Sequence, residues 1–230
     1  MNDCTEKAAR IKVTELEQKI GRRVILDRIT FEVKAGEWFG VFGTRGVGKT
    51  ILLHTLAGIT RYKSGQVEVL GCDPRKTEAF KRCLGVVTQE PSLFRDLRVI
   101  ENLDFIATLK KARRSDIIRV IDQFELAAFL QQSLDSLEAG IYQRLALACA
   151  MVNSPKVLII DDLLDGIDLY SQQLMQREVQ AFVDSGGTCV WGFSQVEQCS
   201  LLHRVGWLEN GQLTIMDPQI LVKKWQQQLE

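Results

Sequence analysis

The sequence lacks the two features that most directly tie a chain to a membrane or to nucleic acid. Its 29 Lys and Arg residues balance 29 Asp and Glu residues, so no broad electrostatic field would attract nucleic acid or anionic lipid. No apolar run reaches the roughly 18 residues that a membrane-spanning helix requires, and the polar segment Met1 to Arg10 lacks the apolar core of a secretion signal. If this protein works at a membrane, another chain supplies the span.

The sequence also lacks the cysteine and histidine spacing of a zinc site and of a disulfide framework. The six cysteines are scattered, without CxxC spacing and without histidines at ligand spacing, which argues against a zinc site and a disulfide framework. They are Cys4, Cys72, Cys83, Cys149, Cys189 and Cys199. We therefore expect reduced cysteines in a cytoplasmic protein. No internal repeat or low-complexity tract is present.

The hydrophobic pattern indicates an α/β protein. Residues Ile11 to Phe31 predict two antiparallel strands joined by a turn at Gly21. Helical spacing dominates from Leu97 to about Asn153, and the run Val157 to Ile160 is typical of a central parallel strand. At 230 residues the chain suits one domain over 1–230 with a helical insert at about 92–153.

A glycine-rich stretch follows the apolar run Trp38 to Phe42 and opens a periodic helical segment. It reads Gly43, Thr44, Arg45, Gly46, Val47, Gly48, Lys49 and Thr50. Glycines permit the positive φ angles that turn several backbone N–H groups toward one polyphosphate, and the following helix contributes its dipole. In this GxxxxGK[ST] motif, Lys49 reaches the β- and γ-phosphates and Thr50 can ligate Mg²⁺. The stretch predicts a nucleotide-phosphate site.

Two further polar residues end apolar strands. Asp161 follows the most apolar strand of the chain, where a carboxylate can hold Mg²⁺ through water beside the phosphate loop. Gln89 ends a shorter strand, and its amide could reach both the metal and an attacking water. The alternatives to these roles are that Asp161 is an ordinary loop aspartate and that Gln89 is an ordinary surface glutamine.

Taken together, these motifs resemble the ATP-binding subunit of ATP-binding cassette (ABC) transporters, from Val13 to about Pro218, most closely the exporter-type cassettes encoded apart from their membrane subunits. The other segments that carry the resemblance are Leu26 to Phe31, Ala35-Gly36-Glu37, Val87-Thr88-Gln89-Glu90, Leu97 to Leu103, Gln143 to Ala148 and Asp165-Gly166-Ile167-Asp168. The resemblance implies a P-loop NTPase (RecA-like) core with an N-terminal antiparallel β subdomain and an inserted α-helical subdomain.

The resemblance also implies cofactors, partners and roles. ATP and Mg²⁺ are the expected cofactors, with Thr50, Gln89 and Asp161 as metal ligands and with Asp162 and Gln89 in catalysis. Two cassettes of this family sandwich two ATP molecules head to tail, so we expect a second cassette and a polytopic membrane permease as partners, and no nucleic acid. The expected location is the cytoplasmic face of the membrane.

Four positions depart from the family pattern. The Ser-Gly of the signature that faces the partner's ATP is Glu138-Ala139 here, and a carboxylate about 4 Å from a phosphate costs several kcal/mol. Either Glu138 points away, as a helix N-terminus would favour, or this face holds ATP poorly. Asp162 replaces the glutamate that polarises the attacking water, Phe193 falls on the switch histidine, and Ile20 replaces the aromatic that stacks adenine. Neither His54 nor His203 matches the switch position.

These departures leave two functions open. The first is the ATP-binding subunit of an ABC transporter, an exporter by resemblance, with slow hydrolysis because Asp162 is one methylene short. The second is a catalytically impaired cassette in which ATP acts as a structural or regulatory clamp. A DNA-repair or translation role is disfavoured because no second cassette or long coiled-coil insert is present, and a GTPase because no Asn-Lys-x-Asp element is present.

Overall fold

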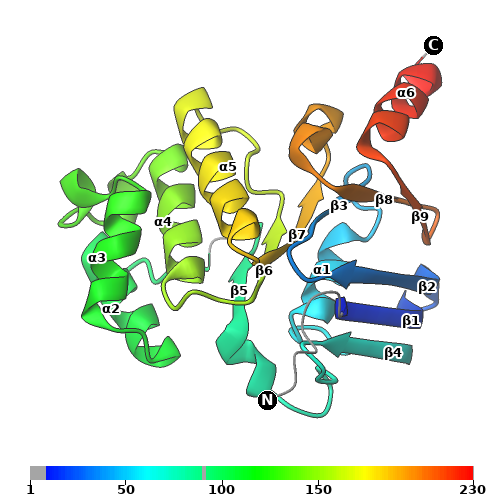
Figure 1. Ribbon diagram of the computed structural model, residues 1–230, viewed down its shortest axis with the longest axis horizontal. Helices are drawn as coiled ribbons and strands as arrows, with labels where there is room; N and C mark the ends of the chain where they lie inside the picture. The colour runs from blue at the N-terminus through cyan, green and yellow to red at the C-terminus, as the bar shows by residue number, and fades with distance from the viewer. Residues whose placement is uncertain (1–8, 90–91, 230) are drawn as a thin grey trace.

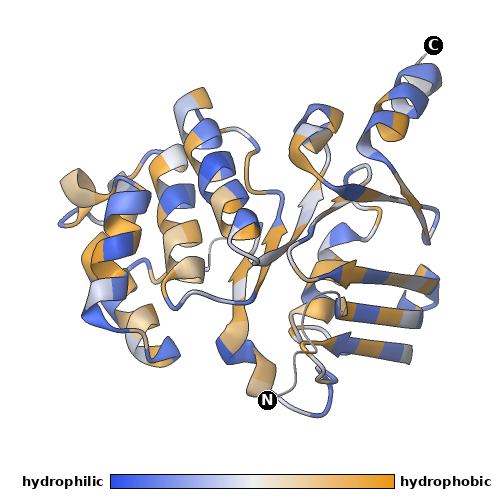
Figure 2. Cartoon of the chain, in the orientation of Figure 1, coloured by the Kyte–Doolittle hydropathy of each residue, from blue (hydrophilic) through white to orange (hydrophobic). Residues whose placement is uncertain are grey.

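The computed structural model describes residues 9–89 and 92–229, which form two β-sheets and a group of helices (Figure 1). The smaller sheet is antiparallel, with the order β2-β1-β4, and consists of β1 (Ala9–Ile20), β2 (Arg23–Lys34) and β4 (Ser64–Val69). Alternate side chains of these strands are buried, and Figure 2 shows the matching alternation of polar and apolar residues. The predicted antiparallel pair is confirmed, with Gly21 at φ 58° in its turn.

The larger sheet has six strands in the order β5-β6-β7-β3-β8-β9. Its members are β3 (Trp38–Phe42), β5 (Leu84–Val87), β6 (Val157–Asp161), β7 (Thr188–Phe193), β8 (Arg204–Glu209) and β9 (Gln212–Met216). The first five in spatial order are parallel, and β9 pairs antiparallel with β8 through a turn at Asn210-Gly211. Every residue of β3, β6 and β7 is buried, as continuous apolar strands require.

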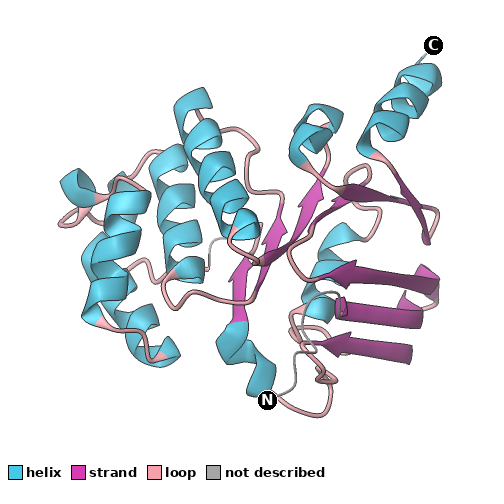
Figure 3. Ribbon diagram, in the orientation of Figure 1, coloured by secondary structure: helices cyan, strands magenta, loops and turns pink. Residues whose placement is uncertain are grey.

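The helices are α1 (Lys49–Leu56), α2 (Val99–Lys110), α3 (Arg114–Gln123), α4 (Ala139–Met151), α5 (Leu169–Asp184) and α6 (Pro218–Leu229). Helices α2 to α5 gather at the left of Figure 3, away from the three-stranded sheet, whereas α1 lies between the two sheets and α6 lies at the upper right. Four short 3-10 helices cover Ala79–Cys83, Ala127–Phe129, Leu134–Ser136 and Val196–Leu201. In the described part of the chain, no helix combines the length and apolar character needed to cross a bilayer.

The insert between β5 and β6 is less continuous than its sequence pattern predicts. Helix α3 ends before Glu125, which adopts a left-handed conformation at φ 51°. From there to α4 the chain makes only two 3-10 turns, so the expectation of an unbroken helical segment was wrong for residues 124–138. Three helices, α2, α3 and α4, nevertheless form the insert and pack against one another.

An aromatic cluster connects the C-terminal helix to the strand before the phosphate loop. Phe42, the last residue of β3, contacts Phe193, Trp207 and Trp225 with ring centroids 5.5, 5.9 and 5.0 Å away. Because Phe42 directly precedes Gly43, this packing fixes the end of β3 at the point where the loop begins.

The cysteines agree with the expectation of reduced thiols where the structure describes them. Cys72, Cys83, Cys149, Cys189 and Cys199 are free. Cys4 lies outside the described residues, as does Glu90 of the motif around Gln89.

Candidate nucleotide site

The sheet order brings three polar loops to one edge. β6, β7 and β3 are neighbours and run parallel, so their carboxyl ends lie side by side. The loop after β3 contains residues 43–48, β6 ends at Asp161, and β7 is followed by Ser194. Ligands of open α/β sheets bind at such an edge.

The loop after β3 owes its shape to two glycines. Gly46 has φ 78° and Gly48, the N-cap of α1, has φ 116°, a value that residues with a Cβ rarely adopt. A Cβ at Gly48 would also lie 2.8 Å from Cγ2 of Ile25. The loop therefore curls tightly into the N-terminus of α1, whose first turn carries no acidic residue, and this arrangement favours an anion.

Lys49 is held by three acceptors. Its Nζ donates to the carbonyl oxygens of Gly43 at 2.8 Å and Thr44 at 3.1 Å, and to Oγ of Ser194 at 2.9 Å. Burial lowers the pKa of Lys49, and the carboxylates of Asp162 and Asp161 oppose that shift. The ammonium group is thus fixed at the mouth of the loop, within a partly desolvated setting where its charge acts strongly.

Asp161 has a carboxylate oxygen without a protein partner. The residue is 2% exposed, its carboxylate shares a hydrogen bond with the Thr50 side chain, and its Oδ2 has no hydrogen-bond partner among the described residues. Burial raises the pKa of Asp161, and the neighbouring Asp162 raises it further. Gly192 makes room for this side chain, since a Cβ there would lie 3.2 Å from Oδ1.

This oxygen set suits Mg²⁺. A buried carboxylate oxygen that lacks a donor, beside a threonine hydroxyl, is a hard-cation donor set. The described residues contain no group of three His, Cys, Asp or Glu side chains that could hold a metal. Thr50 and Asp161 lie together at the carboxyl edge of the sheet, and their role as metal ligands stays a prediction.

The residue that faces Lys49 and Asp162 is Ser194. Its hydroxyl donates to Oδ2 of Asp162 at 3.2 Å while accepting from Lys49. Phe193, to which the family pattern assigned the switch position, is 1% exposed and packs against Phe42. The assignment was one residue off, because alternate residues of a strand point to opposite faces and β7 ends with Phe193 in the core. The sequence signal that could have identified Ser194 is its place as a polar residue directly after a buried strand.

A second polar link across the site was not anticipated. Arg45 Nη2 contacts Oδ2 of Asp165 at 2.5 Å, and Gln195 Nε2 donates to Oδ1 of the same carboxylate at 2.8 Å. These residues come from the loops after β3, β6 and β7, so the link depends on strand order, and no local sequence signal marks it.

Comparison with known proteins agrees with this architecture. The family model described as "ABC transporter" matches residues 26–164, which is more than half of the chain. The chain belongs to the ABC transporter family. It is 30% identical over 208 residues to the probable multidrug ABC transporter ATP-binding protein YbhF of Escherichia coli K12, covering 88% of this chain and 36% of that protein.

Other relatives and structures bear on the fold. The spermidine/putrescine import ATP-binding protein PotA of Bacteroides fragilis is 32% identical over 79% of this chain and 40% of its own length. The chain therefore spans well under half the length of these two curated relatives. The dimeric ATP-binding cassette MJ0796, solved in a post-hydrolysis state with ADP and Pi, superposes with a TM-score of 0.82 at 21% identity over 90% of this chain and 98% of that one. The P-loop NTPase fold is confirmed.

The ABC signature position lies at the start of α4. Glu138 is its N-cap, is exposed, and its side chain makes no capping hydrogen bond. Packing requires a glycine at position 140, because a Cβ there would lie 2.1 Å from Oδ2 of Asp168. This glycine is thus explained by the fold without a ligand.

Gln89 lies between the core and this helix. It is exposed and lines a pocket of about 330 Å³ together with Ala139, Tyr142 and Gln143 of α4, and no phosphate-loop residue lines that pocket. The structure brings Lys49, Thr50, Asp161 and Asp162 together, whereas Gln89 follows β5, the strand next to β6, and faces α4. The base-stacking position, Ile20, ends β1 and is 61% exposed.

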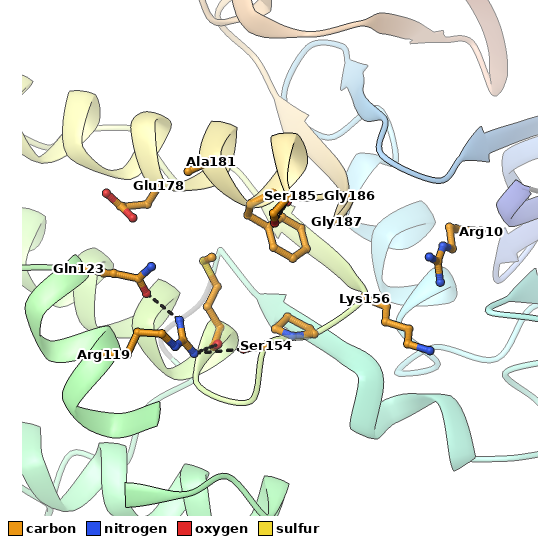
Figure 4. A pocket seen from close by; sticks show the side chains of 13 residues that line it. Arg10, Arg119, Gln123, Ser154, Lys156, Glu178, Ala181, Ser185, Gly186 and Gly187 are labelled. Carbon is orange, nitrogen blue, oxygen red and sulfur yellow. Dashed lines mark hydrogen bonds between the residues drawn. The ribbon is translucent and has the colours of Figure 1, made fainter. Parts of the chain in front are cut away.

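A pocket of about 460 Å³ opens at the opposite edge of the sheet, before β6 and β7 (Figure 4). Arg119 lies at one end of it, where Nη2 donates to the carbonyl oxygens of Met151 and Val152 at 3.1 and 3.0 Å. These carbonyls end α4, so Arg119 neutralises a helix C-terminus. None of the residues that line this pocket belongs to the phosphate loop.

Proposed function

We propose that this chain is the ATP-binding subunit of an ABC transporter, in which binding and slow hydrolysis of Mg-ATP drive a separate membrane subunit. The observation that carries the proposal is the placement of Lys49, held by Gly43, Thr44 and Ser194, next to the partnerless oxygen of Asp161. A cation and a metal-binding carboxylate at the N-terminus of α1 match the two ends of a Mg-polyphosphate. The proposal covers residues 1–230 as one domain.

Each residue of the site has a proposed part. The N–H groups of Gly43 to Thr50 bind the phosphate oxygens, and Lys49 neutralises the β- and γ-phosphates. Thr50 and Asp161 hold Mg²⁺, with Gln89 as a further ligand, and the ion neutralises charge on the phosphates. Asp162 accepts the proton of the attacking water, and the hydroxyl of Ser194 orients its carboxylate at 3.2 Å.

An apolar surface supports a membrane partner. Ile59 is 56% exposed, Leu109 62%, and Phe94 and Phe105 pack edge to face at 4.6 Å while about half exposed. Ile59 lines a hollow of about 290 Å³ between the core and the helical insert, and the neighbours in sequence of the other three residues, Leu93, Ile106 and Lys110, line it too. Exposed apolar side chains near a hollow mark an interaction surface. We assign this surface to the permease and propose that the subunit binds there, at the cytoplasmic face of the membrane.

The surface can be tested with matched charges. Leu109→Glu should remove co-purification with the permease, whereas Ile118→Glu, which changes a 54% exposed residue of α3, should not. Equal loss in both variants would contradict this assignment.

For the direction of transport, we propose that the transporter exports its cargo. YbhF is named as a multidrug transporter component and PotA as an import component, so the relatives include both directions. Inverted membrane vesicles that hold the assembled transporter should accumulate cargo on addition of ATP. ATP-dependent release would indicate import.

The test of nucleotide binding uses calorimetry on the purified chain. Wild type should bind Mg-ATP, and Lys49→Ala should weaken binding by about 100-fold, since a charge-assisted contact worth up to about 3 kcal/mol is lost. Lys156→Ala changes an exposed lysine at the opposite edge of the sheet and should bind as wild type. Absence of binding by wild type would overturn the proposal.

The second function, an ATP-holding clamp without turnover, is favoured by the short side chain of Asp162 and by Glu138 at the signature. Turnover of the complete transporter decides between them. If neither wild type nor Asp162→Glu hydrolyses ATP while both bind it, the clamp is correct.

A further inference from the structure

The third residue of the phosphate loop is an arginine that another loop restrains. Arg45 has a side chain that is 76% exposed, and its guanidinium contacts Oδ2 of Asp165 at 2.5 Å. Gln195 donates to the other oxygen of Asp165, so both oxygens of this carboxylate are engaged. Asp165 therefore joins the loop after β3 to the loop after β7.

Stability alone does not account for an arginine at this place. An ion pair this exposed contributes about 0–1 kcal/mol, and it uses one edge of a guanidinium that has five donors. Arg45 lies in the glycine-rich loop, four residues before Lys49. The Lys49 ammonium is bound by the carbonyl oxygens of Gly43 and Thr44, directly before Arg45, so both cations belong to the same turn of the chain.

The charges at this edge of the sheet set up a competition for the Arg45 guanidinium between a carboxylate and a bound phosphate. Two carboxylates lie against the two cations: Asp165 contacts Arg45, and Asp162 accepts from the Ser194 hydroxyl that itself accepts from Lys49. A terminal phosphate bound at Lys49 would add negative charge close to Asp165. The planar fork of an arginine binds a carboxylate or a phosphate with similar geometry but cannot satisfy both with the same edge.

We propose that Arg45 is a specificity-determining residue that recognises the terminal phosphate of a nucleoside triphosphate, in competition with Asp165. The γ-phosphate takes the guanidinium edge that Asp165 holds in the structure, whereas a diphosphate ends too early to reach it. Triphosphate binding thereby frees Asp165 and the loop that follows β6. This inference rests on the proposed function, because it assumes that the loop binds a nucleotide.

The experiment compares affinities for Mg-ADP and for the magnesium complex of a non-hydrolysable β,γ-imido analogue of ATP, by calorimetry on the whole chain. Arg45→Ala should lose about tenfold or more for the triphosphate, the size of one charge-assisted hydrogen bond, and less than threefold for ADP. Arg45→Lys, which keeps the charge without the fork, should fall between. Arg177→Ala, which breaks an ion pair with Glu178 on α5 by removing a largely exposed arginine (66% against 76% for Arg45), should change neither affinity.

Asp165→Asn separates competition from simple repulsion. If Asp165 competes for Arg45, this change strengthens triphosphate binding in the wild-type background and has little effect in Arg45→Ala. If Asp165 only repels the phosphate through space, the gain persists in Arg45→Ala, and the competition is overturned. Equal losses for both nucleotides in Arg45→Ala would overturn the recognition role.

The failure of the inference is distinct from failure of the proposed function. If wild type binds both nucleotides and Lys49→Ala binds neither, the loop is a nucleotide site whatever Arg45 does. If wild type binds neither nucleotide, the proposed function itself fails. Both changed side chains are partly or largely exposed, so folding is expected to survive, and a thermal unfolding curve for each variant checks this.

Discussion

Two helix N-termini in this protein have opposite character. Helix α1 begins after a left-handed Gly48 and buries Lys49 at its first position. Helix α4 begins at an exposed glutamate, Glu138, whose carboxylate faces solvent. Both ends offer free N–H groups and a positive dipole, but only the first combines them with a cation and an open anion-sized curl. The anion preference of a helix end is thus set by its first side chains.

The glycines at these two helix N-termini have different physical roles. Gly46 and Gly48 have positive φ, so they shape the backbone around a ligand. Gly140 has an ordinary helical position and gives α4 room to approach Asp168 and Ser171 at the start of α5. The packing of α4 against α5 therefore requires a glycine at position 140.

The largest expected effect is at Asp162, which Ser194 links to Lys49 at the start of α1. Asp162→Glu should raise ATP turnover by the complete transporter on the order of 10²-fold, because the added methylene moves the carboxylate about 1 Å toward the attacking water. The melting temperature should fall slightly, since Asp162 has φ 52° and aspartate tolerates that conformation better than glutamate. Asp184→Glu, at the end of α5, is the control for turnover. Unchanged turnover would remove Asp162 from the mechanism.

The next effect tests the packing role at α4. Gly140→Ala should lower the free energy of unfolding by about 1–3 kcal/mol, because its Cβ would displace Asp168, which caps α5 by accepting from the Ser171 N–H at 2.8 Å. Denaturant unfolding measures the change. The adjacent exposed variant Ala139→Ser should leave stability within about 0.5 kcal/mol. A stable Gly140→Ala protein would show that α4 and α5 can separate.

Asp161→Asn should act in opposite directions on stability and binding. Burial raises the pKa of Asp161, so its ionised form is disfavoured in the folded state, and stability is lost as pH rises through the unfolded and then the folded pKa. Asparagine is neutral throughout, so the metal-free melting temperature at pH 7 should rise by about 2–4 °C, while Mg-ATP binding weakens. Asp104→Asn, on the exposed face of α2, should change neither. A lower melting temperature would mean that the charge is compensated.

The smallest effect is expected at Glu138. Glu138→Gln should raise turnover or nucleotide-dependent association severalfold at low salt, because it removes a carboxylate from the start of α4. The gain should shrink at high salt, as for any exposed charge. Asp135→Asn, three residues earlier and also exposed, is the matched control. A salt-independent result would place Glu138 away from the partner's nucleotide.

Much of this architecture is predictable because local chemistry specifies it. The glycine-rich loop and the buried strand that ends at Asp161 follow from residue types and spacing alone. The assignment of Phe193 to the phosphate site was wrong because family alignment carries no information on which strand face a residue occupies. The break between α3 and α4 was missed because a left-handed Glu125 leaves no mark in the hydrophobic period.

The sequence by itself determined the phosphate loop, the α/β class, the antiparallel pair and the family. Only the tertiary structure decided which polar groups meet: Ser194 with Lys49, and Arg45 and Gln195 with Asp165. The reason is that backbone turns and strand periodicity are local properties, readable in a short window of residues. Contacts between loops after β3, β6 and β7 depend on the order of strands in the sheet, which no local window contains.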